Sequence, residues 1–419
     1  MAEQLETSSG APKTFREALI NKRMVACIFT GFSSGLPLFL VFQMVPAWLR
    51  DSGLDLKTIG LFSLLSITYT FKFLWAPFMD RYTFPFLGRR RGWMLVTQIP
   101  LLILMMTFGL FSPTEDIRAI MVIVALTAFF SGSQDIVLDA YRREILPDDE
   151  LGAGNSIFTS AYRAASFVPG ALGLILAGLV SWPFAHLVVG SFMIVGIITT
   201  FFIPESSKGA APATLAKAVV EPFKEFFSRD GSWHTGLLIL LFIILYKFGD
   251  NMATALETPF YLDMGFSLVE IGSVAKLAKF WSAIAGALIA GVLMIKLGIN
   301  RCLWIFGFVQ IGSIFGYYLL AEAGNNMTML IVAVSFEYLG VGLGGVAIIS
   351  FMARSTSKMY TATQLALLTS IAAIPRTLAT ASTGFIVDSV GWSQFFLICM
   401  LLAIPGMLLL FKVAPWNQK

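Results

Sequence analysis

Residues 131–141 read Ser131-Gly132-Ser133-Gln134-Asp135-Ile136-Val137-Leu138-Asp139-Ala140-Tyr141 and place two carboxylates inside a run that is otherwise typical of a membrane-spanning helix. At helical spacing Gln134, Asp135 and Asp139 fall on one face. Because lipid cannot solvate an ionised group, this face is expected to line a water-filled cavity or to meet partner charges. For Asp139 an alternative is a simple pair with Arg142 at the end of the helix.

The composition places the whole chain in a membrane. Of 419 residues, 57% are hydrophobic and 13% are charged, and the mean hydropathy is +0.79. Such values lie outside the range of soluble globular proteins. The three cysteines stand singly in apolar runs and the two histidines lie far apart, so no disulfide framework, metal site or cofactor is expected. A hydrolase built on serine, histidine and aspartate is not supported either.

Apolar runs long enough to cross about 30 Å of hydrocarbon recur twelve times. We predict an all-α integral membrane protein with a cytoplasmic N-terminal segment (1–23), a six-helix bundle (24–203), a linker with an amphipathic helix (204–235), a second six-helix bundle (236–413) and a short tail (414–419). The spans are expected at 24–49, 57–79, 92–112, 118–141, 152–180, 184–203, 236–262, 268–297, 302–321, 327–353, 362–388 and 392–413. The first run lacks a cleavage site and should act as an uncleaved span.

Basic residues orient the chain. Most of the 29 lysines and arginines fall in the termini, the linker and the loops on the same side, whereas the opposite side holds Arg50, Lys57 and Arg118. By the positive-inside rule, both termini and the 80–91 loop are expected in the cytoplasm.

The two halves repeat each other. Residues 53–60 and residues 265–272 both have the form G-x-x-L-x-x-I-G, and Arg163 and Arg376 keep nearly the same offset. Parallel repeats of six spans with a binding site near the midplane are the arrangement of major facilitator transporters. The sequence therefore predicts two pseudo-symmetric bundles of this type.

The loop after the second span carries a charged motif. Residues 76–81, Ala-Pro-Phe-Met-Asp-Arg, are followed by Gly88-Arg89-Arg90-Arg91. This resembles the signature Gly-x-x-x-Asp-Arg-x-Gly-Arg-Arg of the major facilitator superfamily, with Ala76 in place of glycine and five extra residues before Gly88. The resemblance implies that the loop charges hold the inner gate shut. The expected gating residues are Asp80, Arg81, Arg89, Arg90, Arg91 and Asp139.

Further motifs make the resemblance narrower. The chain resembles AmpG-type anhydromuropeptide permeases from about residue 20 to 410. The motifs that carry this resemblance are Asp55 to Gly60, Phe71 to Pro77, Gly88 to Trp93, Ser133 to Val137, Tyr246 to Asp250 and Ala362 to Leu368. The resemblance implies a monomeric proton-driven importer of GlcNAc-1,6-anhydroMurNAc peptides in the inner membrane of a Gram-negative bacterium. Its partners would be an anionic muropeptide, protons and the lipid bilayer, and not nucleic acid. The resemblance also implies that the chain is not an enzyme.

Two other functions remain open at this point. The Gln-Asp core at 134–135 is also similar to acetyl-CoA transporters, so another bulky anion is the first alternative. A membrane enzyme acting on lipid-linked wall precursors is the second, but the non-cytoplasmic loops are short and poor in acids and histidine. The glycine-rich runs lack a following Lys-Ser or Lys-Thr, so an ion gradient is the expected energy source.

Charges within the spans supply the candidate site. The expected substrate-binding residues are Gln134, Arg163, Lys247 and Arg376, and the candidate proton carriers are Asp135, Asp250 and Glu337. Arginine's planar fork suits carboxylates, and a buried carboxyl group can change charge between conformations. The alternatives are that the two arginines form static pairs with buried acids and that Lys247 and Asp250 satisfy each other at i and i+3.

Overall fold

The structure, a computed structural model, describes residues 21–54, 67–85, 87–206, 214–228, 233–267 and 270–417. Within these ranges the regular structure is helical, apart from an isolated bridge between Phe84 and Gly88. A membrane-spanning segment must satisfy its backbone groups internally, which favours helices wherever the apolar runs occur. The expected N-terminal helix near residue 14 lies outside the described residues.

The first half forms one bundle around α2 and α8. α2 (Lys22–Phe39) begins at Asn21, whose side chain accepts hydrogen bonds from the N–H groups of Arg23 and Met24. The other elements of this bundle are η2 (Leu40–Met44), α3 (Val45–Asp51), α5 (Ile67–Thr70), η4 (Lys72–Leu74), α6 (Ala76–Arg81), α7 (Arg89–Thr107), η5 (Phe108–Leu110), α8 (Ile117–Ile145), α9 (Leu151–Ala164), η6 (Val168–Leu172), α10 (Gly173–Leu179), α11 (Trp182–Ser191) and α12 (Met193–Phe202).

The second half forms the other bundle. Its elements are α14 (Trp233–Tyr246), α15 (Phe248–Ala255), α16 (Glu257–Asp263), η7 (Ile271–Ala275), α18 (Lys276–Leu297), α19 (Ile299–Ala323), α20 (Met327–Arg354) and α21 (Thr361–Val413). The seventh span is interrupted at Lys247 and again at Leu256, where the backbone leaves the helical region. α21 contains both the eleventh and twelfth spans, joined at Gly391 with φ of 77°. A positive φ is accessible to glycine without steric cost.

The predicted fold class is confirmed. Ten helical segments of the described chain are long and apolar enough to cross a membrane, and their bounds follow the predicted spans closely. The second predicted span is described only from Ile67 onward, and the eleventh begins at Thr361 as the first part of α21.

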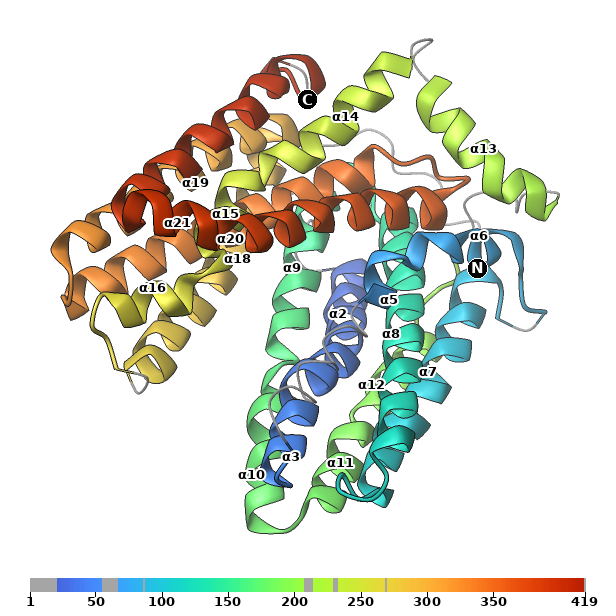
Figure 1. The fold of residues 1–419 in the computed structure, drawn as a ribbon. Coiled ribbons are helices and arrows are strands. Elements are labelled where there is room, and N and C mark those ends of the chain that lie inside the picture. The colour runs from blue at the N-terminus through green and yellow to red at the C-terminus, as the bar shows by residue number, and fades with distance from the viewer. Residues whose placement is uncertain are drawn as a thin grey trace.

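The two bundles touch on one side of the membrane and separate on the other. Figure 1 shows the ends of α3 and α10 far from α16, whereas α6 and α13 lie where the bundles meet. We call the side that carries Asp80 the latch side and the opposite side the open side. The bundles are in close contact where α9 crosses α18: a Cβ atom added at Gly291 would lie 2.5 Å from the Cβ of Ser156. The Ser156 hydroxyl donates to the Ala287 carbonyl at 2.5 Å across the same contact.

The linker contains α13 (Leu215–Ser228), in agreement with the amphipathic pattern. Ala218 and Phe226 are buried, and the side chains of Glu221 and Glu225 face the eleventh span. Glu225 accepts a hydrogen bond from the Gln364 amide at 2.6 Å. This helix therefore packs against protein on the latch side, while Val219 and Val220 on its other face are exposed.

Candidate functional site

A buried ion cluster fastens the latch side of the first bundle. Arg90 is fully buried, and its guanidinium donates to Asp80 at 2.8 Å and to Glu144 at 2.5 Å. Arg89 adds a longer ion pair to Glu144 at 3.6 Å. One end of α6, the start of α7 and the end of α8 are thereby joined through charge-assisted hydrogen bonds.

The same cluster reaches across to the second bundle. Asp80 accepts hydrogen bonds from the backbone N–H and the hydroxyl of Thr363, both at 2.8 Å. It also accepts from the N–H of Ala362 at 3.3 Å. α21 begins at Thr361, so the Asp80 carboxylate lies at a helix N-terminus, where the helix dipole and unpaired N–H groups favour a negative charge. We call Asp80, Arg89, Arg90, Glu144 and Thr363 the latch.

The remaining expected gating residues lie outside the latch. Arg91 donates to the carbonyls of Thr200 and Phe201 at the end of α12. Arg81 lies over the ring of Tyr82, with 5.7 Å between the guanidinium carbon and the ring centroid. Asp139 pairs with Arg142 at 2.8 Å, as the alternative reading of this residue expected, and with Lys72 at 3.9 Å.

A second set of polar contacts joins the two bundles next to the Asp139–Arg142 pair. Arg142 donates to the side-chain amide oxygen of Asn155 at 2.6 Å, and its guanidinium carbon lies 3.8 Å from the centroid of the Phe158 ring. The Asn155 amide in turn donates to Ser350 on α20 at 3.0 Å. Spans four, five and ten are joined in this way, so the latch side is shut by two successive layers.

Residues 131–141 of α8 contact the first span. The Ser34 hydroxyl donates to Asp135 at 2.6 Å, and the Gln134 amide donates to Ser33 at 2.7 Å. Gln134 is fully buried among these helices. In this conformation Gln134, an expected substrate contact, is held inside the first bundle, whereas Asp135 is only partly buried.

The second bundle gathers three of the predicted residues at one place. Lys247 pairs with Asp250 at 2.5 Å and donates to Gln310 at 2.7 Å. Glu337 accepts from Ser313 at 2.7 Å and lies within hydrogen-bonding range of Asp250. The i, i+3 alternative for Lys247 and Asp250 is therefore realised, but with a second carboxyl group beside it. We call Lys247, Asp250 and Glu337 the carboxyl pair site.

Two carboxyl oxygens in this site lack a hydrogen-bond donor among the described residues. They are Asp250 Oδ1 and Glu337 Oε1, and both are buried. An unpaired buried carboxylate oxygen is costly. A site that leaves two such atoms free is suited to take up a further proton or a ligand.

The structure describes the side chain of only one of the two arginines that were predicted to bind substrate, Arg163. Arg163 forms no ion pair with the described residues, and its buried Nη1 has no hydrogen-bond partner among them. The static-pair alternative is thus not realised for Arg163 within this part of the chain. The side chain of Arg376 lies outside the described residues.

Sequence reasoning missed the partners that complete these clusters. Glu144, Thr363 and Asn155 are ordinary polar residues at span ends and are far in sequence from the residues that they bind. A further group on the open side joins Glu257, Lys279 and Tyr338 from three spans. Glu257 and Lys279 can be recognised in the sequence as charged residues within predicted spans. Nothing in the sequence indicates that they pair with each other.

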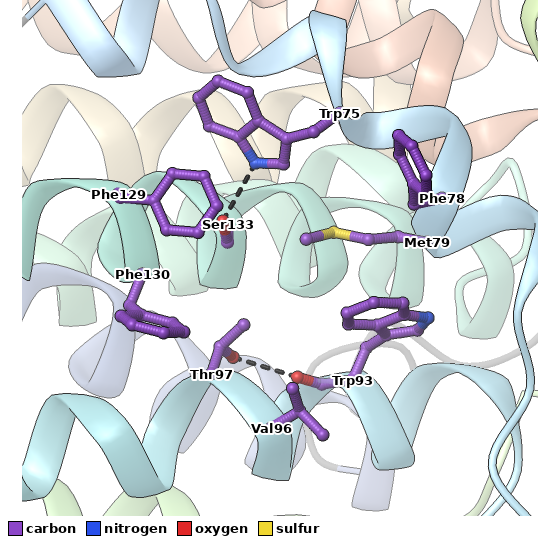
Figure 2. A pocket seen from close by; sticks show the side chains of 9 residues that line it. All are labelled: Trp75, Phe78, Met79, Trp93, Val96, Thr97, Phe129, Phe130 and Ser133. Atoms are coloured by element: carbon purple, nitrogen blue, oxygen red, sulfur yellow. Dashed lines mark hydrogen bonds between the residues drawn. The ribbon is translucent and has the colours of Figure 1, made fainter. Parts of the chain in front are cut away.

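An apolar groove on the first bundle is a poor candidate for the substrate site. It has a volume of about 260 Å³ and lies between α6, α7 and α8. Figure 2 shows the rings of Trp75, Phe129 and Phe130 and the side chains of Phe78 and Val96 around it, with Ser133 bonded to the indole of Trp75. Phe78, Val96 and Phe129 are exposed on the outer surface of spans. The groove therefore faces lipid and offers almost no polar group to a charged ligand.

Comparisons with known proteins agree with this architecture. The Major Facilitator Superfamily model matches residues 27–380. The chain is 46% identical over 411 residues to an uncharacterised protein of Haemophilus influenzae, covering 96% of each. It is 41% identical over 391 residues to the anhydromuropeptide permease of Escherichia coli K12, covering 93% of this chain and 79% of that one. The human organic anion transporter MFSD10 has a similar fold, with a TM-score of 0.71 at 14% identity over 93% of this chain and 99% of its own.

Proposed function

The chain belongs to the AmpG-type permeases of the major facilitator superfamily, and we propose that it imports GlcNAc-1,6-anhydroMurNAc peptides together with protons. The substrate class follows from the anhydromuropeptide permease to which the chain is 41% identical. Its relatives are permeases and transporters, so a membrane enzyme is not its function. Arg163, whose buried Nη1 has no hydrogen-bond partner among the described residues, suits a peptide that carries carboxylates.

The observation that carries the proton step is the carboxyl pair site. Asp250 and Glu337 are buried side by side, and like charges at hydrogen-bonding distance repel strongly in a medium of low dielectric. Such a pair holds one proton between its two groups, while Lys247 balances the remaining charge. When the bundles rock and water reaches the site from the other side, the shared proton can leave.

The latch supplies the alternating access. In this conformation the latch side is shut by the contacts between α6 and α21 and between α9 and α20. Opening that side requires Asp80 to leave the N-terminus of α21 and Asn155 to leave Ser350. The substrate site would then face the latch side, and the cycle would continue as the rocking of two bundles.

The excess of basic residues on the latch side supports a cytoplasmic position for that side. The proposal also takes the transporter to be a monomer in the inner membrane, as the resemblance to AmpG-type permeases implies. Single cysteines at Lys217 and at Asp51 test this orientation, because both positions are exposed and the native cysteines are buried. An impermeant thiol reagent outside spheroplasts should label position 51 and spare position 217. The reverse pattern would invert the proposed topology.

Uptake of a labelled anhydromuropeptide into right-side-out vesicles tests the function itself. Uptake should collapse on addition of a protonophore. Asp250→Asn and Glu337→Gln should abolish accumulation but retain exchange of internal for external substrate, since exchange needs no net proton movement. Asp263→Asn, at a surface carboxylate of the same span that accepts from Trp392, serves as the control. Uptake that ignores the protonophore would sink the proton-coupling part of the proposal.

A further inference from the structure

The open side of the second bundle holds a compact ionic group that neither the latch nor the carboxyl pair site includes. Lys279 of α18 forms an ion pair with Glu257 at the start of α16. The Tyr338 hydroxyl of α20 donates to the other oxygen of the same carboxylate at 2.5 Å. The Lys279 ammonium also lies 4.4 Å from the centroid of the Tyr338 ring. Both oxygens of Glu257 are therefore engaged, one by a cation and one by a phenol.

This group is accessible, unlike the latch. The Lys279 side chain is 40% exposed and the Glu257 side chain 18%, whereas Arg90, Asp80 and Glu144 are fully buried. Charged residues within a span are expected to face a water-filled space and not lipid. The Glu257 carboxylate is thus within reach of a solute that enters from the open side.

Two further cations lie on the helix segments next to this ion pair. Lys276 is exposed one turn before Lys279 on the same helix face. Arg163 comes from the other bundle and lies close enough to Tyr338 to interact with it electrostatically. One helical turn beyond Arg163, Phe167 packs on Phe280 with 4.5 Å between ring centroids, so α9 and α18 are adjacent at this depth. The neighbouring segments of α9 and α18 thus carry three positive charges, of which Lys279 is paired with Glu257.

We propose that Glu257 is a resident counter-ion, which occupies in the empty transporter the place that a carboxylate of the cargo takes on Lys279 and Tyr338. This inference rests on the proposed function for the identity of the cargo. An incoming carboxylate is chemically equivalent to Glu257, so it replaces the ion pair and the phenol hydrogen bond one for one. Arg163 then adds a third contact from the opposite bundle, which Glu257 does not make.

The arrangement gives two routes for closing the open side. Closing it requires the open-side ends of the two bundles to approach each other, which brings Arg163 toward Lys276 and Lys279. Like charges that lose water repel, so the approach needs an anion between them. A bound cargo carboxylate supplies that anion during import. Glu257 supplies it during the return of the empty transporter.

Glu257→Gln separates these two routes. The variant lacks the competing carboxylate, so labelled anhydromuropeptide should bind the purified protein about three- to tenfold more tightly. The empty return should slow, because Lys279 is then unpaired. Net uptake into proteoliposomes should fall about tenfold, while exchange of internal for external substrate should stay within about threefold of the wild type. Glu322→Gln, an exposed acid on the open side of α19, is the matched control and should change none of these quantities.

Two further variants make the proposal falsifiable. Lys279→Gln should weaken binding and lower both uptake and exchange, since the cargo loses its cation. The double variant Glu257→Gln/Lys279→Gln should recover part of the net uptake lost in Glu257→Gln, measured at saturating substrate, because no unpaired charge then opposes the return. Equal losses of uptake and exchange in Glu257→Gln, or weaker binding by it, would overturn the resident counter-ion.

A final readout needs no cargo. Spin labels at Leu179 and Leu262, both exposed near open-side helix ends, report the distance between the bundles on that side. Empty Glu257→Gln protein should show a smaller closed population than the wild type and Glu322→Gln. An unchanged distance distribution would overturn the inference whatever the cargo is. Failure of the wild type to move any muropeptide would instead overturn the proposed function alone.

Discussion

The latch and the carboxyl pair site are both buried ionic clusters, yet they differ in how completely their polar atoms are used. In the latch, Arg90 donates to two carboxylates and Asp80 accepts three hydrogen bonds from α21 in addition. In the carboxyl pair site, one oxygen of Asp250 and one of Glu337 remain without a partner among the described residues. A cluster whose polar atoms are all hydrogen-bonded stabilises one conformation. A cluster with unused acceptors can gain a proton or a ligand.

The largest effect is expected from breaking the latch at Arg90. Arg90→Gln removes the cation paired with Asp80 and leaves Glu144 with only the longer pair to Arg89, and removing one partner of a buried pair costs about 3–5 kcal/mol. The closed latch side should lose roughly a hundredfold or more in its equilibrium against the open one. Distances between spin labels on the latch side should lengthen, and net transport should fall to background.

Arg81→Gln is the control for that prediction. Arg81 belongs to the same charged loop but contacts only the Tyr82 ring among the interactions that the structure describes. It should leave both the distances and transport within about twofold of the wild type. Equal effects at the two arginines would show that the loop acts through its total charge and not through the latch geometry.

The second prediction compares the bundles through their carboxylates. Glu337→Gln removes one group of the adjacent pair, whereas Asp135→Asn alters a carboxylate that accepts from Ser34. If the pair carries the proton, Glu337→Gln should abolish accumulation, and Asp135→Asn should slow uptake by no more than about tenfold. Measured proton flux per muropeptide distinguishes them. Loss of coupled proton flux only in Asp135→Asn would move the coupling site to the first bundle.

A smaller effect is expected at Arg163, which follows Tyr162 on α9 and interacts electrostatically with Tyr338 of the other bundle. Arg163→Ala removes one charged contact to a carboxylate, worth about 1.5–3 kcal/mol, so the dissociation constant of the muropeptide should rise roughly ten- to a hundredfold. Arg163→Lys should recover part of the affinity because it keeps the charge and loses the planar fork. Because Arg163 has no ion-pair partner among the described residues, its loss should not destabilise the protein. A fall in melting temperature equal to that of Arg90→Gln would refute this reading.

The sequence predicted the helices better than the ion pairs and hydrogen bonds that join them. Spans were predictable because length and hydropathy alone decide them, and the linker helix because its apolar residues repeat at helical spacing. The charged motif after the second span identified Asp80 and Arg90. Their partners escaped prediction because Glu144 and Thr363 are 54 and 283 residues away in sequence, at the ends of other spans.

The candidate site shows the same division. Lys247 and Asp250 are near neighbours, so helical spacing predicts their contact. The position of Glu337 beside them, and the meeting of Glu257, Lys279 and Tyr338, depend on how three spans pack. Helical spacing places Gln134 on the polar face of its helix. Its hydrogen bond to Ser33 could not be predicted, because packing sets the rotation of the first span about its axis.

The smallest effect tests whether the linker helix α13 helps to hold the latch side shut. Tyr360, between α20 and α21, donates to Glu221 of α13 at 2.5 Å, and this hydrogen bond raises the pKa of Tyr360 to about 12. The stabilisation is complete below the ordinary tyrosine pKa of about 10 and is lost only as the pH rises through about 12. Tyr360→Phe should therefore lower stability by roughly 1 kcal/mol, or about 2 °C in Tm, equally at pH 6 and pH 8. Tyr82→Phe, at an exposed ring on the same side, should leave Tm unchanged. A destabilisation by Tyr360→Phe that appears at pH 8 but not at pH 6 would mean that a different group, and not this phenol, joins the linker to the second bundle.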